Sequence, residues 1–270
     1  MPELPEVETT VRGLRLPLEG QRLVSVEPRR PDLRRPIPPD LRQRMTGSTV
    51  TALGRRAKYG LIETDRGDTL IFHLGMSGSW RIDPAEIGRH DHLLIETGVG
   101  RRLALNDPRR FGSLDLVETA ALADFPAFRA LGPEPLGPDL TAAHLQRVFD
   151  GRVAPVKALL LDQRIVAGLG NIYVCEALHL AGIAPTTPGG RIGKPRLVRL
   201  VDAIRAVLTA AIQAGGSTLR DYVQPNGELG YFASQWRVYG REGEACECGA
   251  VVARRVDGGR STFFCPKCQR

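Results

Sequence analysis

The stretch LGPEPLGPDL, residues 131–140, divides the sequence into two parts with different patterns of predicted secondary structure. Its three prolines and two glycines stop any helix or strand, because proline lacks an N–H donor and glycine disfavours regular structure. Stiff segments of this kind are typical of domain boundaries. The sequence therefore predicts an N-terminal domain over residues 1–130, a linker over 131–140 and a separate C-terminal part.

Short β-like runs separated by turn residues precede the boundary. They cover residues 48–53, 60–64, 69–73, 92–96, 101–105 and 113–117. Runs at such regular intervals predict an antiparallel sandwich or barrel. Ahead of them, Val7, Val11 and Leu14 fall at helical spacing and predict a short helix packed on the sheets. The proline-rich stretch 28–39 predicts a basic loop.

Helical patterns follow the boundary, over residues 141–149, 156–162, 172–180 and 195–214. In the last of them Leu197, Val201 and Ile204 begin an apolar stripe, and Gly215-Gly216 ends the pattern. We expect a helical domain over residues 141–232, which closes with a loop over 217–232. The fold class is therefore α+β.

Four of the five cysteines lie in the last 25 residues, in the pattern Cys246-Glu-Cys248 and Cys265-Pro-Lys-Cys268. This spacing predicts a zinc finger over residues 236–270, although the first pair is one residue shorter than in most zinc ribbons. A pair of disulfides is the alternative. Between the cysteine pairs, two β-like runs flank Asp257-Gly-Gly259 and predict a hairpin that leaves Arg260 exposed.

Composition limits the classes of partner and compartment. Hydrophobic residues make up 42% and charged residues 25%, a globular balance. A formal charge of +7 and a pI near 9.5 favour a polyanionic partner such as nucleic acid. The sequence contains neither an apolar run of about 18 residues nor a signal core, so we expect a cytoplasmic protein.

The first six residues, MPELPE, offer a chemical possibility. Removal of Met1 would give Pro2 a free secondary amine, and α-amino groups titrate near pH 7.7 to 8. Such an amine can attack an aldehyde-like carbon and form an iminium, with Glu3 and Glu6 nearby as acids or bases. Taken alone, the stretch is better explained as an ordinary helix start.

Several motifs together resemble the formamidopyrimidine-DNA glycosylase family, in the order in which that family carries them. They are MPELPEVETT (1–10), RRAKYG (55–60), HLGMSG (73–78), NDPRRFG (106–112), AGLGNIY (167–173), GYF (230–232), VYGREGE (238–244) and the cysteine finger. The resemblance implies an N-terminal β-sandwich with flanking helices, a helix-two-turn-helix domain and a β-hairpin zinc finger. It also implies a monomeric base-excision repair enzyme that acts on damaged double-stranded DNA and holds one structural zinc ion.

The resemblance further implies two activities, excision of oxidised purines and cleavage of the abasic site. Pro2 matches the family's Schiff-base nucleophile, Glu3 its proton donor and Glu6 a supporting carboxylate. Lys58 matches the proton donor for β-elimination, and Arg260 the residue associated with δ-elimination. Outside this context, Lys58 and Arg260 would be ordinary surface cations.

Seven further residues match DNA contacts of the family: His73, Met76, His90, Arg109, Phe111, Arg152 and Asn171. Met76, Arg109 and Phe111 match a trio that fills the space left by an extruded nucleotide, and two apolar wedges beside a guanidinium suit that task. Their glycine-rich surroundings predict exposed turns rather than core positions. The loop at 217–232 matches a segment that closes over the lesion. Purely structural roles are expected for His92, His144, His179 and Cys175.

Two other functions remain compatible with these patterns. One is the same fold acting on oxidised pyrimidines, although MPELPE resembles the purine-specific branch better. The other is a non-enzymatic zinc-ribbon protein that binds DNA. A pure binder would have no use for a free Pro2 amine beside Glu3 and Lys58.

Overall fold

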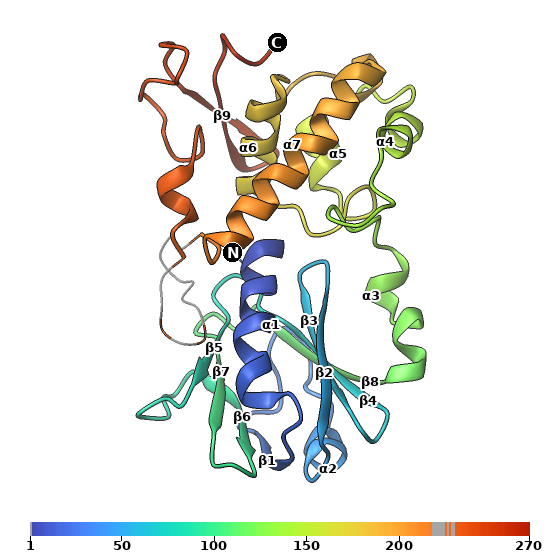
Figure 1. Cartoon of the computed structure of the whole chain (residues 1–270), viewed down its shortest axis with the longest axis vertical. Coiled ribbons are helices and arrows are strands. Elements are labelled where there is room, and N and C mark those ends of the chain that lie inside the picture. The colour runs from blue at the N-terminus through green and yellow to red at the C-terminus, as the bar shows by residue number, and fades with distance from the viewer. Residues whose placement is uncertain (1, 218–224, 226, 228–229) are drawn as a thin grey trace. The chain divides into compact units, whose positions relative to one another are not determined.

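A computed structural model of the chain describes residues 2–217, 225, 227 and 230–270, which group into two compact units (Figure 1). The first comprises Met1–Arg129 and Ala214–Tyr231, and the second comprises Ala130–Gln213 and Phe232–Arg270. The first change of unit thus falls beside the proline- and glycine-rich segment 131–140. The described part of Ala214–Tyr231 groups with the first unit because Ser217 N–H donates to Glu6 and Ile82 N–H donates to the Pro225 carbonyl.

Two four-stranded antiparallel sheets form the body of the first unit, with strand orders β1-β6-β7-β5 and β2-β3-β4-β8. Their strands are β1 (Leu23–Pro28), β2 (Val50–Arg56), β3 (Tyr59–Thr64), β4 (Asp68–His73), β5 (Ser79–Ile82), β6 (Asp91–Thr97), β7 (Arg102–Asn106) and β8 (Ser113–Glu118). The predicted sandwich is confirmed. Sequence patterns missed β1, which runs into the proline-rich loop, and β5, which is four residues long.

Helix α1 (Leu4–Leu18) packs on the apolar faces of both sheets (Figure 1). Its Val7, Val11 and Leu14 are almost completely buried in one core with residues from all eight strands. Phe72 and Trp80, one from each sheet, meet edge to face with ring centroids 5.5 Å apart. Burial of this apolar face removes it from water and fixes where the N-terminus of the helix lies.

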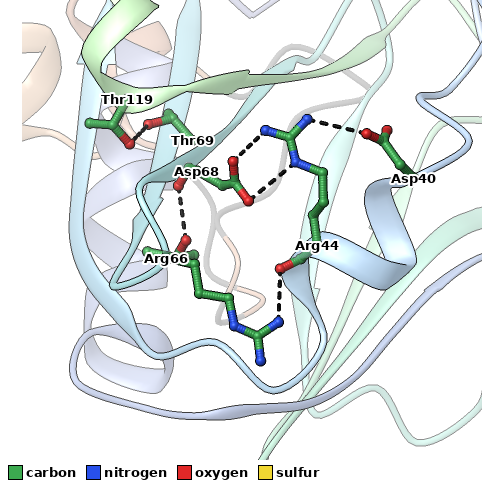
Figure 2. Close-up of polar contacts among 7 residues, drawn as sticks. Asp40, Arg44, Arg66, Asp68, Thr69 and Thr119 are labelled. Carbon is green, nitrogen blue, oxygen red and sulfur yellow. Dashed lines mark hydrogen bonds and ion pairs between the residues drawn. The ribbon is translucent and has the colours of Figure 1, made fainter.

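The short helix α2 (Leu41–Met45) was not predicted, because five residues are too few to show a helical period. Leu41 and Met45 anchor it in the core. On its polar side, the Arg44 guanidinium donates to Asp68 at the start of β4 and to Asp40 at 3.2 Å, as Figure 2 shows. The elements η1 (Thr119–Asp124) and α3 (Pro126–Arg129), also missed, end the unit.

Four α-helices shape the second unit: α4 (Ala142–Phe149), α5 (Val156–Leu161), α6 (Asn171–Ala181) and α7 (Lys194–Gln213). All four were predicted, within a few residues at each end. The apolar stripe of α7 is buried, and α6 packs against that helix. Two 3-10 turns, η2 (Gly189–Arg191) and η3 (Phe232–Gln235), connect the helices to the remaining segments.

The predicted C-terminal hairpin consists of β9 (Ala253–Asp257) and β10 (Arg260–Phe264). Gly258 and Gly259 form its two-residue turn with φ of 55° and 75°, the left-handed conformation that favours glycine at both positions. Arg260 is exposed at the end of this turn, as predicted. Within the ranges described, no helix combines the length and apolar character needed to cross a membrane.

Candidate active site and zinc centre

The chain is buried where α1 begins, and two of the buried residues there are acidic. Pro2 is buried, and Glu3 and Glu6 are only 3% and 2% exposed. The Glu6 carboxylate accepts hydrogen bonds from Glu3 N–H and Ser217 N–H, both at 2.8 Å. Glu6 therefore fixes the backbone of Glu3 at the helix N-cap, where the positive end of the helix dipole favours a carboxylate.

Lys58 lies in the tight turn that joins β2 to β3. Its neighbour Ala57 has a φ of 51°, and Arg55 donates to the Ala57 carbonyl at 2.7 Å, which braces the turn. Arg55 also donates to Glu8 of α1 at 3.0 Å. Burial alone would raise the pKa of Glu8, but hydrogen bonds from Arg12 and Arg55 outweigh it and lower that pKa. The Glu8–Arg55 pair thus ties the helix that carries Glu3 to the turn that carries the buried Lys58.

His73, at the end of β4, is held as a neutral ring. Burial, together with the nearby charges of Lys58 and Arg34, lowers its pKa to about 4. Its Nδ1 accepts a hydrogen bond from Gly75 N–H at 3.0 Å, so the ring proton resides on Nε2. His73 and Lys58 therefore belong to the same neighbourhood, and His73 offers a neutral N–H donor there.

The low pKa of His73 makes part of the stability depend on pH. The unfolded pKa is near 6.5, so the neutral ring favours the native state above that value, and the contribution is lost as pH falls from 6.5 to about 4. The loss should reach at most about 3 kcal/mol. We expect urea unfolding to show that His73→Asn, which keeps an acceptor for Gly75, removes this part of the pH dependence. A stability difference between variant and native protein that stays constant over this range would contradict the assignment.

The loops that carry Met76, Arg109 and Phe111 are exposed, as their sequences predicted. Met76 is 38% and Phe111 43% exposed, and the Arg109 guanidinium lies 4.9 Å from the Phe111 ring centroid. The two loops meet at Gly75, whose φ is 62° and where a Cβ would lie 2.3 Å from the Phe111 carbonyl carbon. Two apolar tips and a cation therefore stand together on closely joined loops.

In the second unit, the hairpin that carries Arg260 is docked on two helices. Asn171, the first residue of α6, donates through Nδ2 to the Ser261 carbonyl at 2.9 Å. Lys157 of α5 donates to the same carbonyl at 3.1 Å and to Thr262 Oγ1 at 2.6 Å. Lys157 is 3% exposed and burial lowers its pKa. Sequence reasoning missed it, although a single lysine within the apolar helix Val156–Leu161 was a usable signal.

Two other predicted DNA contacts lie in loops. Arg152 is exposed between α4 and α5, and half-buried His90 precedes β6. Structural roles for His92 and His144 fit their contacts, because each ring bonds to a backbone carbonyl, that of Asp107 or Ile165.

The four predicted cysteines converge on one point. Their sulfurs all lie within 4.8 Å of one another, with Cys246–Cys268 at 3.8 Å and Cys248–Cys265 at 3.5 Å. Zinc–sulfur bonds of about 2.3 Å in a tetrahedron separate the sulfurs by about 3.8 Å, so the cluster fits one zinc ion. The shortened first pair still closes, because Cys246 and the chain near Ala250 form a tight hydrogen-bonded turn.

Two groups outside the tetrahedron favour bound metal. A hydrogen bond from Ala250 N–H and contacts with the other thiols lower the pKa of Cys248 to about 7, which favours its thiolate form, while the Cys248 contact and burial raise the pKa of Cys268 to about 12. His179 Nε2 of α6 lies 3.4 Å from Cys246 Sγ and can donate to that thiolate. The purely structural role expected for His179 therefore needs refinement, since this helix residue supports the metal site.

A β-sandwich with a buried acidic helix start and exposed apolar loop tips, in one chain with a helical unit and a four-cysteine hairpin, is the architecture of DNA-repair glycosylases with a zinc finger. Comparison with known proteins identifies the family within this class. Residues 1–114, 131–223 and 243–270 match, in turn, the formamidopyrimidine-DNA glycosylase N-terminal domain, its H2TH domain and the zinc finger found in FPG and IleRS. The chain belongs to the formamidopyrimidine-DNA glycosylase family.

Relatives and solved structures match over essentially the full length. Formamidopyrimidine-DNA glycosylases of Rhizorhabdus wittichii and Novosphingobium aromaticivorans are 77% and 67% identical to the chain, with 100% of each chain covered. A Lactococcus lactis FPG mutant in complex with a Fapy-dG containing DNA has a TM-score of 0.92 at 35% identity, again over 100% of both chains. The MutM (FPG) protein of Thermus thermophilus has a TM-score of 0.87 at 40% identity and covers 99% of this chain and 98% of its own.

Proposed function

We propose that the protein excises oxidised purines, chiefly formamidopyrimidines and 8-oxoguanine, from duplex DNA and then cleaves the abasic site by β- and δ-elimination. The observation that carries the proposal is the buried start of α1, where Glu6 fixes Glu3 beside Pro2. Solved complexes of the Lactococcus lactis relative with a Fapy-dG containing DNA and with an abasic site containing DNA support the substrate class. Because that substrate is chromosomal DNA, we place the protein in the cytoplasm, at the nucleoid.

The reaction begins with attack of the Pro2 amine on C1′ of the damaged nucleotide. The bond from C1′ to the base breaks, the Pro2 N–H proton passes to the departing base, and Glu3 protonates O4′ as the sugar ring opens, so that an iminium joins Pro2 to C1′. The positive iminium acidifies the C2′ proton. As water takes that proton, the bond from C3′ to the 3′ phosphate breaks, and Lys58 donates a proton to the departing phosphate oxygen. A second elimination, assigned to Arg260, expels the 5′ phosphate, and hydrolysis of the iminium restores the Pro2 amine.

Extrusion of the damaged nucleotide costs a few kcal/mol of stacking and pairing, roughly, and leaves a hole in the duplex. We assign Met76 and Phe111 to fill that hole, and Arg109 to bond the orphaned partner base. His73, His90, Arg152 and Asn171 are assigned to the phosphate backbone. The structural zinc, held by the four cysteines, keeps the hairpin of Arg260 folded.

Borohydride trapping tests the proposal. The protein is incubated with a duplex that contains one formamidopyrimidine or one 8-oxoguanine, and sodium borohydride reduces any iminium to a stable covalent adduct. We expect one adduct per chain, which peptide mass mapping should locate at Pro2. The product strands should carry phosphate at both new ends. Absence of the adduct on both duplexes would refute the proposal, and trapping on oxidised pyrimidines alone would move the protein to the other substrate class.

A further inference from the structure

Asp107, a residue with no role in the chemistry above, lies where three loops meet. Its side chain is 1% exposed, and both carboxylate oxygens are used. Ser77 Oγ–H donates to Oδ1 and Gly112 N–H donates to Oδ2, both at 2.8 Å. A buried carboxylate with both oxygens bonded by neighbouring loops holds those loops at fixed separation.

The backbone of Asp107 also bonds to the loop that carries His90. Its N–H donates to the His90 carbonyl at 2.9 Å, and its carbonyl meets His92 Nε2 at 3.0 Å. Ser77 in turn accepts a hydrogen bond from Arg109 N–H at 3.3 Å. The three loops joined at Asp107 are residues 74–78, 88–92 and 107–112, which we call the clasped loops.

Each clasped loop carries residues that the proposed function assigns to DNA, namely Met76, His90, or Arg109 with Phe111. We propose that Asp107 is a positioning residue whose carboxylate fastens the Met76 loop to the Arg109–Phe111 loop, so that the three side chains enter the duplex as one preformed wedge. The inference rests on the proposed function and adds the device that orders the wedge. A wedge ordered before it meets DNA loses little conformational freedom on insertion.

The wedge is needed only where a base must be unstacked from a duplex. A single-stranded abasic oligonucleotide has no partner base and no stacked hole, whereas its sugar still reacts with Pro2. Loss of the Asp107 side-chain hydrogen bonds should therefore slow the reaction on the duplex and leave the reaction on the single strand unchanged. A defect in folding or in Pro2 chemistry would slow both.

The test compares Asp107→Asn and Ser77→Ala with Ser77→Thr, which keeps the hydroxyl. Single-turnover cleavage of a lesion duplex should fall about 10- to 100-fold for the first two and recover in the third. Borohydride trapping on the single-stranded abasic oligonucleotide should stay within about twofold of native protein, since no wedge acts there. With 2-aminopurine as the partner base, the fluorescence rise that reports wedge insertion should become slower or smaller in the same two variants.

Asp68→Asn serves as the matched control. Asp68 is also a buried aspartate, but it bonds to Arg44 at the opposite end of β4 (Figure 2), away from the clasped loops. The Asp68→Asn variant should have a lower unfolding temperature, but its rates on the duplex and on the single strand should change by the same factor. An equal loss on both substrates for the clasp variants, or no change on the duplex, overturns the inference. If native protein traps on neither substrate, the proposed function itself has failed.

Discussion

One extra residue ahead of Pro2 is expected to abolish covalent trapping and lesion cleavage while DNA affinity stays within about threefold. The extra residue converts the Pro2 amine into an amide, whose nitrogen has no lone pair available for attack on C1′. Removal of a catalytic nucleophile typically costs on the order of 10⁴-fold or more in rate. Binding should persist, because the clasped loops and the zinc hairpin are left unchanged.

The experiment uses a fusion that a protease cuts to leave either Gly-Pro2 or Pro2 at the terminus. The two proteins are expressed in the same way and differ only by the terminal glycine, so the second is a matched control for the first. Pro2→Gly adds a primary amine at the same place and should trap weakly. Mass spectrometry of the terminus, gel-shift affinity and borohydride trapping are measured on each. If Gly-Pro2 protein traps as strongly as Pro2 protein, the nucleophile lies elsewhere.

Replacement of Cys265 by serine is expected to release zinc, unfold the hairpin and weaken DNA binding by about 100-fold or more. Cys265 is completely buried in a small core with Cys246, Val238 and Val252, so its replacement disturbs both the metal cluster and the core of the finger. For structural zinc sites of this kind, the metal supplies about 10–16 kcal/mol of folding free energy. Without it, Arg260 loses its fixed position beside α6.

Cys175→Ser is the matched control, because Cys175 lies in the same small core but contributes no sulfur to the cluster. Elemental analysis should find one zinc per chain in native protein and in this variant, and none in Cys265→Ser. His179→Phe should retain zinc with about 10- to 100-fold lower affinity, since it removes the donor to the Cys246 thiolate. One zinc per chain and native DNA affinity in Cys265→Ser would contradict a structural role for the metal.

The sequence contains most of the fold in local patterns. Eight strands and five helices, α1 and α4 to α7, follow from spacing, apolar period and glycine or proline boundaries. Strand β5 and helix α2 escaped because four or five residues carry no period. Each is fixed by partners distant in sequence, as α2 is by Asp68 of β4.

Some residues of the site could likewise be predicted from the sequence and others could not. The cysteine cluster and the exposed loops are visible in the sequence, because spacing and composition carry their chemistry. The partners of the residues that hold the site in shape are not visible there. Asp107, Lys157 and His179 each act on a segment at least 30 residues away, or on several at once, so only the folded chain reveals what they bond to.

The close approach at Gly75 has a consequence for engineering. Because no side chain fits between Gly75 and the backbone of Phe111, neither loop can change length or path unless the other changes with it. Attempts to alter the partner-base preference by exchange of one loop between relatives should give poorly folded hybrids. The transferable module is residues 73–78 together with 107–112, which have to be transplanted as a pair.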